Sequence, residues 1–414
     1  MEDVLSALRL AATTLGVLVL LVTAAEVLAR RAIQRGGYYV LQPGLRVRLQ
    51  PDPEVFPNLE RVVRFEVNRE GERGDDVPRG RGLYRMLVAG GSQPEGYLLD
   101  QHTTWPGALQ RTLNEPAHLA ALGASRAHVG NIARSGVGSE ALDLIFERVL
   151  PRYPRLAAIV ILVGASDVLR WLEVGAFRTP PPVRAADVFR SHPEMTFGWH
   201  PRRLALLEVM RRTRHRWLRP VQRHDRACRW IARARAMRAR ATTVRTELPD
   251  PAPMLAHFDK HFQRLVQRAK AHADRVIVVR QPWFGAAQTA EDIALMWHGG
   301  VGQAWQEEVT TFYSLDVLSG LMAQLDRRAA ELAEALDVEH LDLQPVLDGC
   351  AHAYYDFFHA TPQGARVIAA AVADATLQAP LRGPIPALTV RPEASTWIRA
   401  RASARCGCSP TAST

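Results

Sequence analysis

Lysine is almost absent from this chain of 414 residues. Only Lys260 and Lys270 are lysines among its 52 basic residues, so arginine supplies nearly all of the positive charge behind the formal net charge of +10. A GC-rich genome produces such a bias as readily as selection for phosphate contacts does. The sequence also lacks zinc-finger spacing and the aromatic motif of RNA-recognition domains, the signatures that would support nucleic-acid binding. We therefore do not expect nucleic acid as a partner.

Cysteine is also scarce. Cys228, Cys350, Cys406 and Cys408 are too few and too scattered for a disulfide framework in a chain of this size. Cys406 and Cys408 form a Cys-Gly-Cys within a segment rich in Ser, Ala and Thr, and other metal-ligating residue types are missing beside them. We therefore predict a mobile C-terminal tail over residues 381–414, and the cysteines leave the redox compartment open.

The rest of the composition is that of a globular protein. Hydrophobic residues make up 47% of the chain and charged residues 23%, which excludes a disordered or fibrous class. The length suits one large α/β domain or two smaller domains.

A long apolar run lies near the N-terminus. Residues 10–28 contain one charged residue, Glu26, and a membrane-spanning helix needs about 20 mostly apolar residues. Small residues at 23–25 are also typical of a cleaved signal peptide. Because the run is long and Arg30 and Arg31 follow at once, we predict a membrane anchor over residues 1–35, with the signal peptide as the alternative.

The charges that flank this run bear on its orientation in the membrane. Arg9 precedes the run, whereas five arginines follow it, and positive residues favour the cytoplasmic side. By this rule the main domain would be cytoplasmic. The five arginines are Arg30, Arg31, Arg35, Arg46 and Arg48.

Strand and helix patterns alternate along most of the remaining chain. Residues 36–83 are rich in Gly, Pro and Arg and predict a linker with an edge hairpin near 62–67. The alternation beyond it predicts an α/β domain, a parallel sheet with helices on both faces and with ligands at the carboxyl ends of the strands. The expected strands are 84–89, 127–132, 157–163, 275–280 and 338–343, and the expected helices are 104–113, 140–149, 254–273, 318–336 and 362–379.

Residues 172–252 interrupt this alternation and predict an insertion. A proline-containing stretch is followed by an arginine-dense region, 202–245, whose apolar residues recur at roughly helical spacing. We expect solvated helices packed beside the site. The alternative is a basic amphipathic lid on an anionic membrane surface.

Three residues combine the types needed for nucleophilic catalysis. A serine hydroxyl is a weak nucleophile until a histidine removes its proton, and a carboxylate orients that histidine. Ser92 follows the first strand, while Asp356 and His359 stand before the last helix and can share one tight turn. Taken alone, each motif has a simpler explanation, because Gly-Gly-Ser occurs in many turns and Asp-x-x-His often caps a helix.

These motifs, in this order, resemble the SGNH (GDSL-type) hydrolase family, in its Gly-Gly-Ser subgroup, over residues 84–380. Gly90-Gly91-Ser92 is similar to the family's first block, Asn131 to Gly136 to the second, Gly164 to Asp167 to the third, and Asp356 to His359 to the fifth. The resemblance implies a three-layer α/β/α, flavodoxin-like fold and an esterase in which Ser92 attacks, His359 carries the proton and Asp356 orients the ring. It also implies an extracytoplasmic domain, opposite to the flanking arginines.

The resemblance further implies an oxyanion hole formed by the backbone N–H groups of Ser92 and Ala133 and by the side chain of Ser166. Ala133 stands where the family has glycine, and Ser166 stands where it has asparagine. A serine hydroxyl donates over a shorter reach, and loss of one oxyanion donor typically costs about 100- to 1,000-fold in rate.

No cofactor or metal is expected. His257 and His261 have the i, i+4 spacing of zinc-binding helices, but no glutamate follows His257. We predict a solvated helix face for these histidines.

The function expected is that of a membrane-anchored serine esterase. Its substrate would be an acyl ester, either an O-acetyl group of a cell-envelope glycan or a lipid acyl group. One alternative is an O-acyltransferase with the same triad. Another is a catalytically silent binding or scaffold protein in envelope-polymer assembly. The sequence indicates no particular protein partner.

Overall fold

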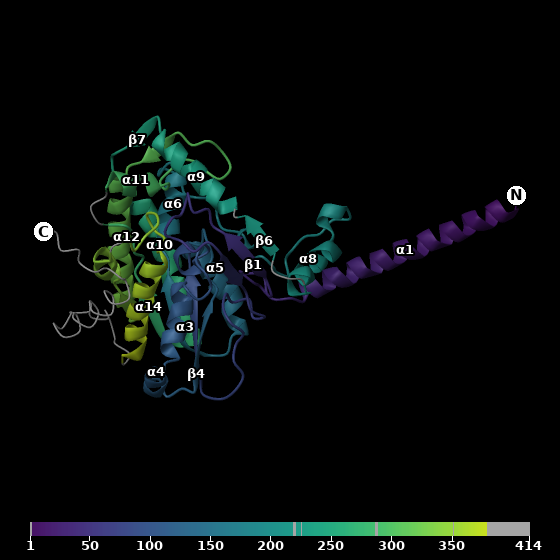
Figure 1. The fold of residues 1–414 in the computed structure, drawn as a ribbon, viewed down its shortest axis with the longest axis horizontal. Helices are drawn as coiled ribbons and strands as arrows, with labels where there is room; N and C mark the ends of the chain where they lie inside the picture. Colours follow the sequence, from purple (N-terminus) through teal and green to yellow (C-terminus); the bar gives the residue numbers. More distant parts are fainter. Residues whose placement is uncertain (1, 218–220, 225, 286–288, 351, 379–414) are drawn as a thin grey trace.

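The computed structural model describes residues 2–217, 221–224, 226–285, 289–350 and 352–378 (Figure 1). The predicted tail, 381–414, lies outside this range together with Cys406 and Cys408.

A five-stranded parallel sheet forms the centre of the molecule. Its strand order is β10-β8-β5-β3-β4, so the first core strand lies between the second and the third, as in flavodoxin-like folds. The predicted parallel sheet is thus confirmed. The strands are β3 (Leu83–Gly90), β4 (Arg126–Asn131), β5 (Leu156–Leu162), β8 (Ala273–Val279) and β10 (Glu339–Leu341).

Helices cover both faces of this sheet. Side chains of β3 alternate between two cores: Met86 and Val88 pack on one face, and Leu87 and Ala89 pack on the other. The result is the three-layer arrangement that the alternating pattern predicts. The first face carries α3 (Trp105–Leu113), α13 (Gln344–Asp348) and α14 (Pro362–Leu377), and the second carries α5 (Ser139–Val149), α6 (Ala165–Glu173), α10 (Ala252–His272) and α12 (Leu315–Ala335).

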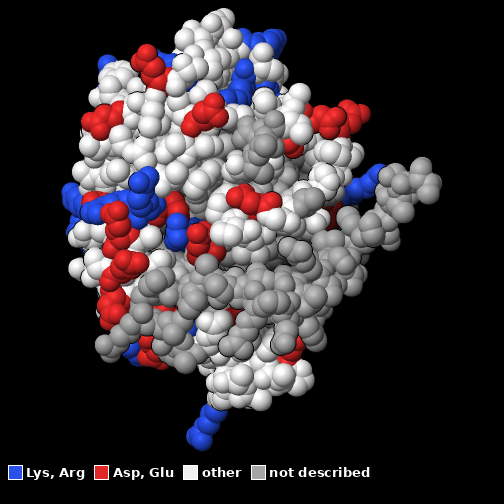
Figure 2. All heavy atoms as spheres, turned by 90° about the vertical axis from the view of Figure 1, so that its left-hand side faces the viewer, with Lys and Arg blue, Asp and Glu red and all other residues white. Residues whose placement is uncertain are grey.

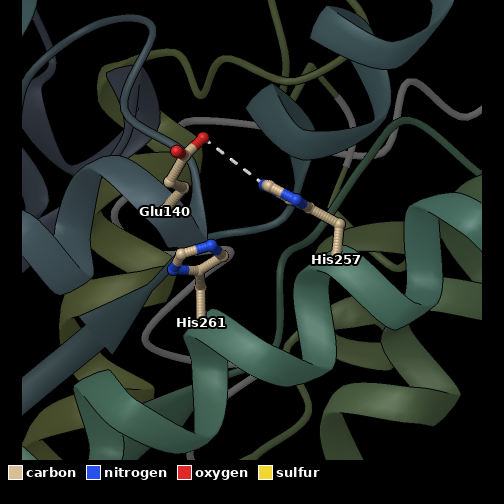
Figure 3. A group of neighbouring side chains, drawn as sticks. All are labelled: Glu140, His257 and His261. Carbon is tan, nitrogen blue, oxygen red and sulfur yellow. Dashed lines mark ion pairs between the residues drawn. The ribbon is translucent and has the colours of Figure 1, made fainter. Parts of the chain in front are cut away.

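A ladder of ion pairs joins α5 to α10. His257 Nε2 lies 3.4 Å from a Glu140 oxygen (Figure 3). His261 Nδ1 lies 3.1 Å from Asp143, which also accepts from Arg268. The prediction of a solvated face is wrong for His261, which is only 8% exposed, whereas His257 is half-buried. The two histidines meet carboxylates from a helix more than 100 residues earlier, which helical spacing alone does not reveal.

Residues 36–83 pack against the domain and are more than a linker, while the hairpin expected near 62–67 is present in a sheet of its own. Strands β1 (Arg46–Gln50) and β2 (Val63–Glu66) pair antiparallel, and β1 also pairs parallel with β6 (Val221–His224). These three strands form a sheet that is separate from the central one. The polar composition of this segment suggests an exposed linker. The segment is nevertheless partly buried, because its charged groups pair with residues that lie far away in the sequence.

Glu72 shows how this segment attaches to the central sheet. It is fully buried, and its carboxylate accepts from Asn68, from Arg85 and from His128 on β4. Burial alone would raise its pKa, but the hydrogen bond and charge of His128 outweigh burial and bring the pKa to about 2. A Cβ on Gly130 would lie 2.5 Å from this carboxyl carbon, so the contact requires glycine.

The insertion contains strands as well as the expected helices. After α8 (Ala205–Trp217) come β6 and α9 (Arg226–Ala239), and then β7 (Thr243–Arg245), which pairs with β9 (Thr311–Tyr313). The prediction of solvated helices is therefore only partly right.

Arginines of α9 hold the loops around the site. Arg235 donates to the carbonyls of Val55 and Leu295, and Arg238 donates to those of His298 and Tyr313. Burial lowers the pKa of Arg238 to about 10.

On the face shown in Figure 2, acidic and basic side chains are interspersed and form no continuous basic surface. The abundant arginine thus has structural uses besides surface charge.

Helix α1 (Glu2–Gln34) projects away from the body of the molecule (Figure 1). Its most apolar window has a mean hydropathy of 2.1 and no buried residue, so the helix is long and apolar enough to cross a membrane. The single charge in the apolar run is fully buried at the base of this helix. There Glu26 accepts from Arg30 and from the backbone N–H groups of Ala205 and Leu206, at 2.9 and 2.8 Å for the latter two, and so caps α8.

Candidate active site

Ser92 lies where the strand order of the sheet reverses, between the carboxyl ends of β3 and β5. Ligands of open α/β sheets bind in this crevice. Two glycines allow close contacts on two sides: a Cβ on Gly90 would lie 2.0 Å from the Leu162 carbonyl oxygen at the end of β5, and one on Gly91 would lie 3.1 Å from that of Val137 in the loop after β4. The turn places Ser92 at the first position of α2 (Ser92–Glu95), where its backbone N–H has no helical acceptor.

The structure brings Ser92, His359 and Asp356 together. The Ser92 Oγ is 2.8 Å from His359 Nε2, and His359 Nδ1 is 2.8 Å from each oxygen of Asp356. The His359 side chain is 14% exposed and that of Asp356 is 0% exposed. Such a chain of contacts can carry a proton from the serine to the ring.

The carboxylate of Asp356 is held by donors on several sides. The backbone N–H groups of Phe358 and His359 donate to Oδ1, and Trp297 Nε1 donates to Oδ2 at 2.9 Å. Burial would raise the pKa of Asp356, but the charge of His359 and the hydrogen bonds outweigh burial, so this pKa lies well below its usual value. The carboxylate therefore stays ionised beside His359.

Sequence reasoning missed Trp297 as a site residue. It lies in a long loop 59 residues before Asp356, and no periodicity or motif marks it. Its ring is nearly parallel to that of His359, with centroids 6.4 Å apart, and it stacks on His298 at 3.7 Å. Burial lowers the pKa of His298 to about 3, so this second histidine is neutral.

The simpler explanation of Asp-x-x-His as a helix cap does not apply here. Thr361 caps α14, because its hydroxyl accepts from the backbone N–H of Gly364 at 3.2 Å. Asp356 is thus free to hold His359.

Ala133 does not occupy the position that the resemblance implies. Its N–H donates to the side-chain oxygen of Asn131 at 2.9 Å, and the residue is fully buried away from the cavity. Gly136, three residues later, lines the cavity with φ +80°, a backbone conformation that favours glycine. Among the described residues no acceptor is bonded to its N–H. Within the block Asn131 to Gly136, the glycine at 136 was therefore the better indication in the sequence of the oxyanion donor than Ala133.

Ser166 lies beside the candidate nucleophile, as the resemblance implies. It lines the same cavity as Ser92, and its Oγ is 3.6 Å from the place that a Cβ would take on Gly91. The next residue, Asp167, is half-buried and accepts from the backbone N–H of Ser139 at 2.9 Å and from its hydroxyl at 2.6 Å. Asp167 thereby joins the start of α6 to the start of α5 behind Gly136.

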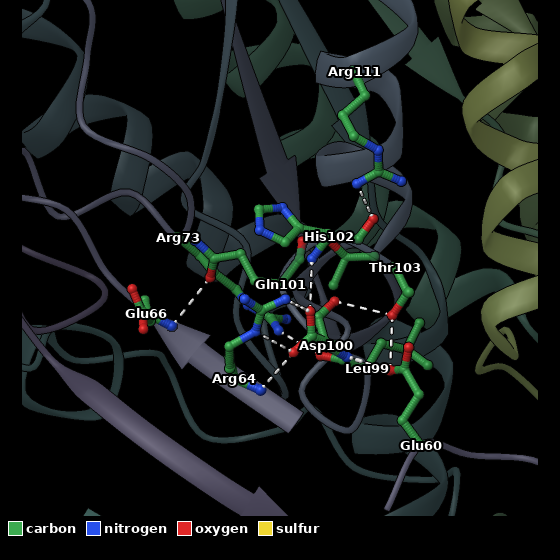
Figure 4. Close-up of polar contacts among 11 residues, drawn as sticks. Glu60, Arg64, Glu66, Arg73, Leu99, Asp100, Gln101, His102, Thr103 and Arg111 are labelled. Carbon is green, nitrogen blue, oxygen red and sulfur yellow. Dashed lines mark hydrogen bonds and ion pairs between the residues drawn. The ribbon is translucent and has the colours of Figure 1, made fainter. Parts of the chain in front are cut away.

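A buried arginine supports the turn that follows Ser92. Arg73 donates to the carbonyls of Glu95, Gly96 and Leu99, which belong to α2 and the loop after it. Arg73 and Leu99 are labelled in Figure 4. Glu95 in turn accepts from the backbone N–H and the hydroxyl of Ser135. Residues before the central sheet therefore position both the serine turn and the loop of Gly136.

An ion pair between Arg64 and Asp100, visible in Figure 4, fixes the same loop from β2. Arg64 donates to both oxygens of Asp100 at 2.9 and 2.8 Å, and Asp100 also accepts from the backbone N–H of Arg64. Thus the three-stranded sheet and the loop after α2 form one unit.

The cavity at this edge of the sheet has a volume of about 1740 Å³. This is large for a small-molecule site, and it leaves room for a bulky ester. Ser92 and His359 lie in its wall among aromatic side chains: Tyr97, Trp230, Trp297, Trp305 and Tyr355.

Glu173, at the end of α6, also lines the cavity and supplies a pH-dependent prediction. Burial raises its pKa to about 7. Between the ordinary pKa of glutamate and 7, the folded state keeps a proton that the unfolded state has lost, so stability falls as the pH rises through this window. We expect Glu173→Gln to stabilise the protein at pH 8 by as much as about 3 kcal/mol and to change nothing at pH 4.

Thermal melts of the detergent-solubilised protein at both pH values measure this effect. The matched control is Glu54→Gln, at an exposed position, which should leave the melting temperature unchanged at either pH. A shift of equal size at pH 4 and pH 8 would contradict the assignment of the effect to ionisation.

Comparisons with known proteins give weak likenesses. No family model matches the chain, and no curated protein matches it. Solved structures that it resembles include LAE5, an alpha/beta hydrolase from the metagenome of Lake Arreo, Spain, at 14% identity and a TM-score of 0.39, over 72% of this chain and 97% of that one. Another is Axe2, an acetylxylan esterase from Geobacillus stearothermophilus, at 13% identity and a TM-score of 0.37, over 71% and 94%. Both TM-scores are below 0.5, so these likenesses carry no argument about the function of this chain.

Proposed function

We propose that the chain is an SGNH-type serine esterase, with a catalytic domain over residues 84–380 and a single-pass anchor in α1. The observation that carries this proposal is the contact chain from Ser92 through His359 to the buried, ionised Asp356 at the rim of a large cavity. The flavodoxin-like strand order and the order of the motifs along the chain support the same class.

The proposed reaction begins when Ser92 Oγ attacks the ester carbonyl carbon while His359 Nε2 accepts the hydroxyl proton. Asp356 holds the Nδ1–H and stabilises the imidazolium. The N–H groups of Ser92 and Gly136 and the Ser166 hydroxyl donate to the oxyanion. His359 then protonates the leaving alcohol, which leaves an acyl group on Ser92. Water, deprotonated by His359, releases the carboxylic acid and regenerates the serine.

The proposed substrates are esters with a bulky alcohol or acyl part, such as O-acetylated envelope glycans or lipids. The volume of the cavity and its aromatic lining support this choice. The same cavity has room for a second sugar, so O-acyl transfer to a glycan hydroxyl is the second candidate. Product analysis with an acyl donor and a glycan acceptor separates the two reactions.

A fluorophosphonate probe tests the proposal on the full chain in detergent. Covalent labelling should map to Ser92, and p-nitrophenyl acetate or butyrate should be hydrolysed. Folded protein that neither reacts with the probe nor hydrolyses either ester would instead favour a silent binding or scaffold role.

Trp297→Phe is expected to lower kcat/KM about 10-fold or more, because a buried hydrogen bond to a charged group contributes about 1.5 to 3 kcal/mol. The variant keeps an aromatic ring over His298 but removes the N–H that holds Asp356. Steady-state hydrolysis of p-nitrophenyl butyrate measures the change.

Trp230→Phe is the matched control for this prediction. Trp230 lines the same cavity, packs on Trp297 at 4.6 Å and has a buried Nε1 without a hydrogen-bond acceptor among the described residues. Equal losses in the two variants would show that the bond to Asp356 is unimportant.

We further propose that the domain faces the extracytoplasmic side of the membrane. Envelope glycans, the first proposed substrate class, are found there, although the arginines after α1 favour the opposite orientation. Fusions of alkaline phosphatase and of green fluorescent protein to the C-terminus test this. Active phosphatase without fluorescence is expected, and the reverse pattern would place the domain in the cytoplasm.

A further inference from the structure

The exposed part of α1 ends abruptly at Glu26. Residues 2–24 are exposed all round, and burial begins with Ala25 and Glu26. A helix of this exposed length spans about 34 Å at 1.5 Å per residue, which matches the roughly 30 Å hydrocarbon core of a bilayer. If α1 crosses the membrane, Glu26 therefore lies close to the level of the lipid headgroups.

A second segment is fixed to α1 at this level. We define the collar as residues 195–214, which include η2 (Pro201–Arg203) and most of α8. Glu26 binds the first backbone N–H groups of α8, and Ala29 and Ile33 pack against Ala205. The collar thus meets α1 within about two turns of the end of its exposed part, as Figure 1 shows.

Trp199 is fixed to the same end of α1. The Arg30 guanidinium lies over its ring at 4.5 Å and donates to the carbonyl of Gly198 at 2.6 Å. Even so, Trp199 remains 63% exposed. A tryptophan at the end of a spanning helix is typical of the membrane interface, where its apolar ring and polar N–H suit the headgroup level.

The exposed surface of the collar combines large apolar side chains with arginine. Leu207 and Met210 are 38% and 56% exposed, and Arg202, Arg203 and Arg214 are also exposed. Single exposed apolar residues are ordinary on a protein surface. In the collar, the exposed apolar side chains and the arginines share one segment close to the headgroup level. At this depth apolar side chains can enter the acyl boundary, and arginines can contact anionic headgroups.

We propose that the collar lies on the surface of an anionic phospholipid bilayer, with Trp199, Leu207 and Met210 in the interface and the arginines against lipid phosphate. This inference rests on the proposed anchor, not on the proposed esterase activity. It gives the insertion a second role: β6, which comes after α8 in the sequence, pairs with β1, so the insertion links the membrane surface to the three-stranded sheet.

Fluorescence quenching in vesicles tests the collar. The full chain is reconstituted into phosphatidylcholine vesicles, with and without phosphatidylglycerol, that contain a lipid with a doxyl quencher near the headgroup. We expect quenching in the wild type that is lost in Trp199→Phe and kept in Trp305→Phe, whose tryptophan is 46% exposed in the cavity wall. Equal quenching in the wild type and Trp199→Phe would overturn the proposal.

A second variant probes the charge of the lipid without changing Trp199. Arg202→Gln combined with Arg203→Gln should remove the increase in quenching that phosphatidylglycerol causes in the wild type. No such increase in the wild type would overturn the anionic part of the proposal. Vesicle flotation after an alkaline wash separates the anchor from the collar: loss of wild-type flotation overturns both, whereas flotation without Trp199 quenching overturns the collar alone.

Discussion

Replacing Ser92 with alanine is expected to lower kcat/KM for ester hydrolysis by a factor of about 10⁴ to 10⁶. The substitution removes the only oxygen that lies 2.8 Å from His359 Nε2 in the described site and leaves the backbone N–H groups in place. His359→Asn should be about as damaging, and the double variant little worse, because the two groups act as one unit. Hydrolysis of p-nitrophenyl butyrate and fluorophosphonate labelling measure the loss.

The control for this prediction is a serine that plays no part in the site. Ser125 is exposed and donates to the carbonyls of Arg81 and Gly82 at the other end of β3. Ser125→Ala should keep full activity, and both serine variants should keep the wild-type melting temperature within a few degrees. Unchanged hydrolysis in Ser92→Ala would remove the esterase proposal.

Replacing Arg73 with methionine is expected to cost about 3 to 5 kcal/mol of stability. Methionine retains an apolar stem but leaves the buried carbonyls of Glu95, Gly96 and Leu99 without their donor, and each unpaired group costs about 1 to 3 kcal/mol. Burial lowers the pKa of Arg73 to about 10, so the guanidinium is still charged at neutral pH. It also lies over the ring of Phe65, at 4.3 Å.

Because those carbonyls belong to the turn after Ser92, the same variant should also react more slowly with a fluorophosphonate. Denaturant titration and the rate of labelling give the two readouts. The matched control is Arg111→Met, whose guanidinium donates to the carbonyl of His102 at the surface and should cost no more than about 0.5 kcal/mol. Similar costs for the two variants would contradict the structural role assigned to Arg73.

The core strands and helices were predictable from the sequence because their signals are local. Side chains of a buried strand alternate between two apolar cores, and a helix buries one stripe, so the period of apolar residues identifies each element. The parallel arrangement follows from the alternation of strands and helices. The carboxyl ends of parallel strands share one edge of the sheet, which is why Ser92 and the Asp356–His359 turn were expected to be neighbours.

The oxyanion loop was predicted less well than the triad. The resemblance placed its backbone donor at Ala133, but the Asn131 side chain bends back and binds that N–H. The chain then turns through a left-handed glycine at 136, which faces the cavity. Which N–H of a loop faces a ligand depends on the path of the whole loop, and residue spacing does not encode that path.

Contacts between distant segments were outside the reach of sequence reasoning. Trp297 binds Asp356 from a loop without a motif, and the polar segment 36–83 buries Glu72 and Arg73 against the central domain. In the sequence, Glu26 is a single charge within an apolar run. In the structure it caps a helix that begins 179 residues later. A buried charge is stable only with partners, and these partners come from other parts of the chain.

By itself, then, the sequence determined the parallel sheet, the alternation of strands and helices along the chain, the apolar N-terminal helix and the serine, histidine and aspartate at the catalytic edge. These depend on local periodicity and on a turn at the end of each strand. The tertiary structure alone decided which N–H groups face the cavity, what holds Asp356, how residues 36–83 support the serine turn and where α8 meets α1. Each of these is a pairing of polar groups far apart in the chain, and such pairings become definite only when the core has packed.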